Sequence, residues 1–269
     1  MILGFIGCGN MGEAMLAGAL LSGWITGDKV LVHTRTEARM DELSIKYSIN
    51  KASKNAEVAE GADFLILAVK PNVYKSTLLE IKEFIRPNTV VLGIAPAYSI
   101  AMIKELIGDD NAKIARSIPN TPAQVGKGIA GVSFSDSMNA EDRKMVVSFF
   151  NSFGTAVEVD EGLLPAVGTL TGSGPAFVYM FIEALAQAGI KHGIPTKEAY
   201  KFAAGTVEGA AVLVEKSDKH PAKLRDEVCS PGGTTIEGVA ALEENGFTSA
   251  VISAVEASIE KFMKMQKKA

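Results

Sequence analysis

Short apolar segments alternate with longer segments of helical periodicity through the first part of this 269-residue chain. Such regular alternation predicts strands followed by helices, and therefore an α/β domain with a mostly parallel sheet. The predicted strands are residues 2–6, 30–33, 63–69, 89–94, 112–115, 128–134 and 155–159. The predicted helices between them include residues 56–60, 73–85, 99–108 and 139–153.

The pattern changes after about Val159, and no strand is predicted beyond that residue. Helices are predicted at residues 162–170, 176–190, 196–215 and 247–265, and another is predicted to begin at residues 234–235 and to run through Leu242. Residues 176–190 are apolar on nearly every face, so we expect this helix to be buried. A helical half of this kind is difficult to bury in a monomer. We therefore expect a dimer or larger homo-oligomer, the alternative being that this half folds back on itself and on the first domain.

A glycine motif lies where the first predicted strand meets the first helix. The residues are Gly7-Cys8-Gly9-Asn10-Met11-Gly12. In this context the first glycine permits a tight turn, the second allows the backbone to approach a pyrophosphate, and the third packs the helix on the strand. The motif predicts dinucleotide binding, and the alternative is a bare strand–turn–helix unit. We predict a Rossmann-like domain over residues 1–160 and an all-α domain over residues 161–269.

The residues after the second predicted strand indicate which dinucleotide is preferred. A fold that prefers NAD would place Asp or Glu there, whereas this chain has Thr34-Arg35-Thr36. Arginine can donate two parallel, charge-assisted hydrogen bonds to a phosphate such as the 2′-phosphate of NADPH. We therefore predict that NADPH is preferred, with NADH possible. The alternative is that Thr34 or Thr36 caps the next helix and that Arg35 is only solvated.

Further candidate residues follow the other predicted strands, because ligands of a doubly wound sheet lie at the carboxyl ends of the strands. Lys70-Pro71 follows strand 63–69 and should border the cofactor. Lys70 could also be a catalytic acid or a surface residue, and we favour a cofactor contact. Residues 95–97 follow strand 89–94, and their small side chains leave space for a nicotinamide ring.

A glycine-rich loop in the helical half has the features of an anion site. Ser230-Pro231-Gly232-Gly233 forms a bent loop, and Thr234-Thr235 begins an apolar helix. The start of a helix leaves N–H groups without partners, and its dipole attracts anions. The glycines allow a small acid to approach the backbone closely. The loop is therefore either a pocket for a small carboxylate or an ordinary capped helix.

Composition narrows the possible partners. The net charge of −4 gives no electrostatic reason to expect nucleic acid or an anionic membrane as a partner. We expect no targeting segment before the first strand, and the most apolar segment is too short to span a bilayer. Cys8 and Cys229 provide neither a disulfide framework nor a zinc-ligand spacing. We expect no metal site and a cytoplasmic location.

Taken together, segments spread over nearly the whole chain resemble one family, pyrroline-5-carboxylate reductase. They are residues 5–12, 68–71, 119–122, 172–177 and 220–235, and the last segment resembles the family signature. The resemblance implies NAD(P)H-dependent reduction of the cyclic imine 1-pyrroline-5-carboxylate to L-proline, the last step of proline biosynthesis. It also implies dimerisation through the helical domain, with possible assembly into decamers.

The resemblance implies a set of site residues as well. The expected cofactor-binding residues are Ile6, Gly7, Cys8, Gly9, Asn10, Met11, Gly12, Thr34, Arg35, Asn55, Ala68, Val69, Lys70, Pro71, Ile94, Ala95 and Pro96. The expected substrate-binding residues are Ser230, Gly232, Gly233, Thr234 and Thr235, with Glu161 a weaker candidate near the domain junction. The Thr235 hydroxyl would act in catalysis by hydrogen-bonding the ring nitrogen. Two positions depart from the family pattern: Glu227, where some relatives have Asn, and Cys229, where others have Ser or Thr.

Two other functions fit part of the pattern. A β-hydroxyacid dehydrogenase or related imine reductase also has a Rossmann domain followed by helices, and the dehydrogenases use a lysine of the helical domain for proton transfer. Lys191 and Lys201 are available, but neither lies in a recognisable motif. A non-catalytic NADP sensor that works by oligomerisation would not need the anion pocket of residues 230–235.

Overall fold

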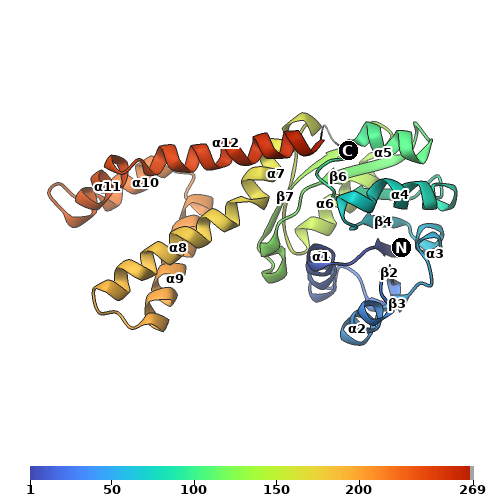
Figure 1. The fold of residues 1–269 in the computed structure, drawn as a ribbon, viewed down its shortest axis with the longest axis horizontal. Coiled ribbons are helices and arrows are strands. Elements are labelled where there is room, and N and C mark those ends of the chain that lie inside the picture. The colour runs from blue at the N-terminus through green and yellow to red at the C-terminus, as the bar shows by residue number, and fades with distance from the viewer. Residues whose placement is uncertain (267–269) are drawn as a thin grey trace. The chain divides into compact units, whose positions relative to one another are not determined.

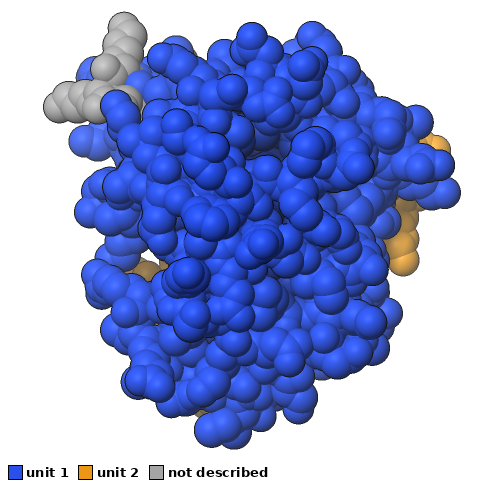
Figure 2. All heavy atoms as spheres, turned by 90° about the vertical axis from the view of Figure 1, so that its right-hand side faces the viewer, with its two compact units in different colours: residues 1–173, 258–269 blue, residues 174–257 orange. Residues whose placement is uncertain are grey.

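The computed structural model describes residues 1–266, which form two compact units. Unit 1 contains residues 1–173 together with the C-terminal segment that begins at Ser258, and unit 2 is Gly174–Ala257. Figure 1 shows the order of the elements, and Figure 2 distinguishes the two units by colour. The division of the chain at residues 160 and 161, which was drawn from the sequence pattern, stays a prediction.

An eight-stranded sheet with the strand order β3-β2-β1-β4-β5-β6-β7-β8 forms the centre of unit 1. The strands are β1 (Leu3–Ile6), β2 (Val30–His33), β3 (Asn50–Lys51), β4 (Phe64–Leu67), β5 (Val90–Gly93), β6 (Lys113–Ser117), β7 (Gly128–Phe134) and β8 (Gly154–Glu158). Neighbouring strands run parallel, except that β6 and β7 are antiparallel. The predicted mostly parallel sheet is therefore confirmed, whereas the antiparallel pair and the short β3 were not foreseen.

The helices of unit 1 connect these strands (Figure 1). They are α1 (Asn10–Leu21), α2 (Glu37–Tyr47), α3 (Asn55–Gly61), α4 (Pro71–Ile81), α5 (Ile100–Ile107), α6 (Ala140–Asn151) and α7 (Leu164–Gly172), with 3-10 turns η1 (Gly27–Lys29), η2 (Lys82–Phe84), η3 (Thr121–Val125) and η4 (Glu161–Leu163). Ser99 caps α5 by accepting a hydrogen bond from the Met102 amide, and Asn139 forms a capping box with Asp142 at α6. These caps explain why both helices begin within one residue of the predicted positions.

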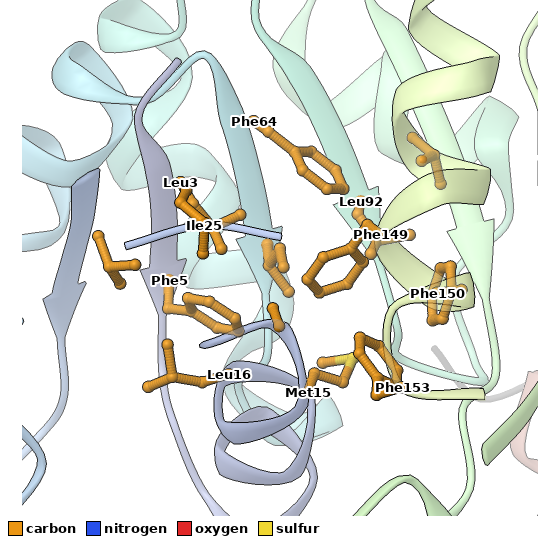
Figure 3. Packing of buried hydrophobic residues seen from close by; sticks show 14 of the residues in the cluster. Leu3, Phe5, Met15, Leu16, Ile25, Phe64, Leu92, Phe149, Phe150 and Phe153 are labelled. Carbon is orange, nitrogen blue, oxygen red and sulfur yellow. The ribbon is translucent and has the colours of Figure 1, made fainter. Parts of the chain in front are cut away.

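Aromatic side chains dominate the core that holds α1 against the sheet (Figure 3). The Phe149 ring of α6 meets the rings of Phe64 and Phe153 edge to face, at centroid distances of 5.3 and 5.0 Å. Such pairs add to the stabilisation that burial of the rings provides. Met15 and Leu16 of α1 are fully buried in the same cluster. The core therefore fixes the helix that follows the glycine motif.

Unit 2 consists of α8 (Gly174–Lys191), α9 (Thr196–Lys216), α10 (Pro221–Val228), α11 (Thr234–Glu244) and the first part of α12 (Phe247–Gln266). The only core cluster found in it among the described residues consists of Ala186, Ala199 and Ala203. Within the single chain, Tyr179 and Met180 of α8 are 59% and 69% exposed. The periodicity identified an apolar helix correctly, and its burial stays a prediction for the assembled protein.

Two further predictions concern the second half of the chain. As predicted, the described part of the chain has no strand after β8. Each helix expected there is present, and the predicted bounds of α7, α8, α9 and α12 differ from the observed ones by at most two residues. Helix α10 was not predicted. None of the helices within residues 1–266 is both long and apolar enough to cross a membrane.

Candidate cofactor and substrate site

The glycine motif forms the turn between β1 and α1. Gly7 has a φ of +77°, and a Cβ at this position would lie 2.8 Å from the Ala68 carbonyl oxygen. A side chain would therefore be strained and would also collide with the neighbouring loop. Gly12 is buried, and a Cβ there would lie 3.3 Å from the Ala68 Cβ, as close packing of helix and strand requires. At Gly9, the N-cap of α1, a Cβ would meet nothing within 4 Å, so the helix N-terminus is open to a ligand.

Most of the predicted cofactor residues lie just beyond the carboxyl ends of the parallel strands. In the register of the parallel strands, Ile6 pairs with both His33 and Leu67, and Leu67 pairs with Gly93. The segments that follow these residues therefore leave the sheet at the same level. They contain residues 7–12, 34–35, 68–71 and 94–96. Ligands of doubly wound folds bind beyond these strand ends, so the segments form one candidate site.

The loop between β2 and α2 carries the residues predicted to select the cofactor. The buried Thr34 donates a hydrogen bond from Oγ1 to the Thr36 carbonyl oxygen over 3.0 Å. Thr36 occupies the N-cap of α2 but makes no side-chain capping hydrogen bond. The alternative that either hydroxyl caps α2 is therefore not supported. Arg35 is exposed, so its guanidinium is accessible to a phosphate.

Asn55, at the start of α3, is held by two neighbours. Its Nδ2 donates to Glu80 Oε2 over 3.0 Å, and its Oδ1 lies 2.6 Å from His33 Nδ1. Because the Asn55 oxygen can only accept, His33 Nδ1 carries the proton. His33 and Glu80 thus orient the Asn55 side chain, and the contribution of Glu80 could not be foreseen from a position 25 residues away.

A network that the sequence analysis missed ties the glycine turn to α2. Arg39 Nε donates to the Cys8 carbonyl oxygen over 3.2 Å, and its guanidinium pairs with Glu13 of α1. Glu13 also accepts hydrogen bonds from Lys46 Nζ and the Tyr47 hydroxyl, over 2.8 and 2.9 Å. Burial of Glu13 opposes its ionisation, but the hydrogen bonds outweigh burial and lower the pKa of its carboxyl to about 2. The only signal in the sequence was an acidic residue in the first turn of α1.

The predicted substrate loop connects α10 and α11 in unit 2. Gly233 is the N-cap of α11, so no side chain caps this helix. Gly232 has a φ of +67°, and a Cβ on Gly233 would collide with Ser230 Oγ. The left-handed backbone at Gly232 therefore favours glycine, whereas a side chain at Gly233 would displace the Ser230 hydroxyl. Thr234 and Thr235 occupy the first two helical positions, next to an uncapped N-terminus, which favours the anion-site interpretation over the capped helix.

Glu161, the remaining substrate candidate, begins η4 in unit 1. Its Oε1 accepts a hydrogen bond from the Ile100 amide over 2.7 Å and another from Arg116 Nη1 over 3.0 Å. The Glu161 side chain is 31% exposed. One carboxylate oxygen is therefore occupied within unit 1, and no local sequence pattern indicated this partnership with Arg116.

Comparisons with known proteins identify the family. The model described as pyrroline-5-carboxylate reductase dimerisation matches residues 161–265, and the model described as NADP oxidoreductase coenzyme F420-dependent matches residues 2–97. The chain is 41% identical over 265 residues to the pyrroline-5-carboxylate reductase of Escherichia coli K12, which covers 98% of each chain. This chain belongs to the pyrroline-5-carboxylate reductase family.

Other pyrroline-5-carboxylate reductases agree with this assignment. The Arabidopsis thaliana enzyme is 35% identical over 259 residues, which covers 96% of this chain and 93% of the relative. The crystal structure of Plasmodium falciparum pyrroline carboxylate reductase with NADP bound has a TM-score of 0.90 and 32% identity, with 99% and 98% of the two chains covered. The predicted family and the predicted fold class, a Rossmann-like domain followed by a helical dimerisation domain, are both confirmed.

Two positions at which this chain departs from the pattern of pyrroline-5-carboxylate reductases now have a structural context. Both carboxylate oxygens of Glu227 accept from Lys219 Nζ, over 3.0 and 2.9 Å, so its charge is balanced by an exposed partner. Cys229 is a free, half-buried cysteine that forms the C-cap of α10.

The other cysteine, Cys8, lies in the glycine turn, where burial raises the pKa of its thiol to about 12 and keeps it protonated.

Proposed function

We propose that this protein reduces 1-pyrroline-5-carboxylate to L-proline with a reduced nicotinamide dinucleotide, the last step of proline biosynthesis. Proteins named pyrroline-5-carboxylate reductase match this chain over almost their whole length. The single observation that carries the proposal is the uncapped N-terminus of α11 behind Gly232 and Gly233, in a chain that also contains an open glycine turn. The first feature suits a small carboxylate, and the second suits a dinucleotide.

The cofactor site fits NADP. The open N-terminus of α1 at Gly9 would hold the pyrophosphate, and the exposed Arg35 with Thr34 would hold the 2′-phosphate. Residues 68–71, 94–96 and Asn55 would border the rest of the cofactor. When bound, the reduced nicotinamide supplies the hydride. A preference for NADPH over NADH is part of this proposal and rests on the Arg35 guanidinium.

In the helical domain, the substrate carboxylate would bind to the free amides at residues 233–235. The Thr235 hydroxyl would hydrogen-bond the ring nitrogen, and Ser230 and Thr234 would line the same loop. The protonated imine has an electrophilic carbon, which accepts the hydride while the C=N π electrons become the lone pair of the amine nitrogen. The protein therefore has no need to supply a strong acid, and its main contribution is alignment of the reacting groups.

We propose a homo-oligomer whose chains pair through unit 2, with the decamer as the larger assembly that such dimers would form. Its support is the exposed apolar surface of α8, together with the match of residues 161–265 to a dimerisation model. We propose no nucleic acid or membrane partner, because the net charge is −4. A cytoplasmic location is proposed because the two cysteines are both free, which suits a reducing compartment.

The experiment that tests this function compares substrates. Purified protein is given NADPH with pyrroline-5-carboxylate, and in parallel NADPH or NADP⁺ with β-oxo or β-hydroxy acids. We expect turnover with the cyclic imine only. Turnover of the hydroxy acids that is lost in Lys191→Met or Lys201→Met would favour the dehydrogenase alternative. NADPH binding without any turnover would remove the substrate assignment and favour a sensor.

A further inference from the structure

Arg116 is a charged residue buried in the sheet of unit 1. It lies in β6, its side chain is 2% exposed, and it pairs with Gly93 in the register of β5 and β6. Burial of a guanidinium is unfavourable unless its donors are paired, and an apolar residue of similar volume is often as stable in such a place. Its Nε has no hydrogen-bond partner among the described residues. Stability alone is therefore a poor explanation for this arginine.

The two hydrogen bonds that Arg116 does make lead to one loop. Nη2 donates to the Pro96 carbonyl oxygen over 2.6 Å, and Nη1 donates to Glu161 Oε1 over 3.0 Å. The same Glu161 oxygen accepts from the amide of Ile100, the first residue of α5. Arg116 thus holds the middle of the β5–α5 loop, residues 94–99, and Glu161 holds its end. The Pro96 carbonyl also accepts from Gln266 Nε2 over 3.3 Å.

Two stacked tyrosines leave this loop little freedom to shift. The rings of Tyr74 and Tyr98 stack with their centroids 4.5 Å apart, and the Tyr98 hydroxyl donates to the Pro71 carbonyl oxygen over 3.4 Å. A Cβ on Gly93 would lie only 2.6 Å from the Tyr74 hydroxyl oxygen, so the end of β5 is packed directly on this ring. Arg116 and the tyrosines therefore join the β5–α5 loop to the β4–α4 loop.

We propose that Arg116 and Glu161 are positioning residues that fix the β5–α5 loop as a wall of the nicotinamide end of the cofactor site. The proposal rests on the proposed function, because that loop carries the expected cofactor residues 94–96. Neither residue is assigned contact with the reacting atoms. Loss of the pair would let the loop relax and would misalign the reaction, whereas the glycine turn and Arg35 would still bind the adenosine end.

The test separates the two ends of the cofactor site. The first variant, Arg116→Lys, keeps the positive charge but lacks the planar guanidinium that donates to two partners, and Arg116→Met removes both the charge and the donors. The third variant, Glu161→Gln, keeps an acceptor oxygen. The matched control is Thr89→Val, which removes a buried hydrogen bond of 3.0 Å to the Ala62 carbonyl oxygen at the opposite end of β5. For each protein we measure the fluorescence of bound NADPH, the affinity for adenosine 2′,5′-bisphosphate, the hydride-transfer rate in a single turnover, and thermal unfolding.

We expect both Arg116 variants to lower the hydride-transfer rate at saturating NADPH by at least about tenfold and to change the fluorescence of bound NADPH. Affinity for adenosine 2′,5′-bisphosphate should stay within about twofold, because the adenosine end is intact. Glu161→Gln should have a smaller effect in the same direction, and Thr89→Val should lower the unfolding temperature alone. If Arg116→Met does not fold, Arg116→Lys and Glu161→Gln carry the test.

Several outcomes would overturn the proposal. One is a folded Arg116→Lys protein with wild-type fluorescence and rate, and another is an equal change of both quantities in Thr89→Val. A rise in the KM for the imine in Glu161→Gln, with no change in the Arg116 variants, would instead assign Glu161 to the substrate. If wild-type protein binds NADPH but reduces no imine, the proposed function fails, whereas the fluorescence and fragment affinities still decide the role of the pair.

Discussion

The two units of the chain differ in how completely each buries its own apolar side chains. Unit 1 surrounds its sheet with two extensive apolar clusters, and its large side chains Phe5, Phe64 and Phe149 are fully buried. Unit 2 has a cluster of three alanines and leaves Tyr179 and Met180 of α8 exposed. Exposed apolar surface of this extent marks an interaction surface. The comparison shows that unit 1 buries its large apolar side chains within itself, whereas unit 2 leaves large apolar side chains of α8 exposed.

The largest effect should come from charging the exposed face of α8. Tyr179→Glu/Met180→Glu should abolish the oligomer, since burial of each side chain contributes about 1.5–3 kcal/mol and a buried carboxylate costs more. The control Ile45→Glu changes an 84% exposed apolar residue of α2 in unit 1 and should leave the assembly intact. Sedimentation velocity measures the outcome. An unchanged oligomer in the double variant would show that α8 is not the interface.

The next largest effect concerns the loop before α11. Thr235→Ala should lower kcat/KM for the imine about a hundredfold and leave NADPH affinity nearly unchanged, because the hydroxyl acts on the substrate only. Steady-state kinetics and fluorescence titration measure the two quantities. Thr206→Ala is the control, because the Thr206 hydroxyl of α9 bonds only to the Phe202 carbonyl oxygen. Wild-type kinetics in Thr235→Ala would remove this threonine from the mechanism.

A smaller effect is expected at the cofactor end of unit 1. Arg35→Met should weaken NADPH binding by about 10- to 100-fold, the loss expected for charge-assisted hydrogen bonds, with little change for NADH. Lys144→Met, which changes an exposed cation of α6, should affect neither cofactor. Isothermal titration with both nucleotides provides the comparison. An equal loss for NADPH and NADH would mean that Arg35 does not read the 2′-phosphate.

The smallest effect is a pH dependence of stability within unit 1. The pKa of Glu13 is lowered from 4.5 to about 2 in the folded protein, so its stabilisation is complete above the unfolded value and is lost as the pH falls from about 4.5 to about 2. Glu13→Gln should therefore cost about 1 kcal/mol at neutral pH, and the difference from wild type should shrink over that range. Denaturant unfolding at several pH values measures it. A constant difference down to pH 2 would contradict the assignment, and Glu105→Gln on α5 serves as the exposed control.

The sequence predicted the elements of this fold better than their environments. Strands β2 and β7 match the predicted bounds, because each is a short apolar segment between turn residues. The two-residue strand β3 was missed because Asn50 and Lys51 carry no apolar signal. The antiparallel direction of β7 was not foreseen, since a strand pattern contains no information on direction. Periodicity identified residues 176–190 as an apolar helix, but it contains no information on which surface covers that helix.

The candidate site was foreseen where neighbouring residues carry it, as at Gly7, Gly9 and Gly12. Contacts between distant residues were not foreseen. Arg116 and Glu161 are 45 positions apart, and Arg39 reaches the Cys8 carbonyl from 31 positions away. No local sequence pattern indicates such pairs, because strand order and register bring the two residues of each pair together. The sequence therefore predicts which segments bind, whereas the structure adds the residues that hold those segments in place.

The central claim is that the chain reduces a cyclic imino acid with a hydride from NADPH. The most direct measurement is the amount of L-proline formed per NADPH oxidised when purified wild-type protein is supplied with pyrroline-5-carboxylate. We predict one proline for each NADPH, with slower turnover when NADH replaces NADPH. NADPH that binds but is not oxidised, or is oxidised without formation of proline, would contradict it.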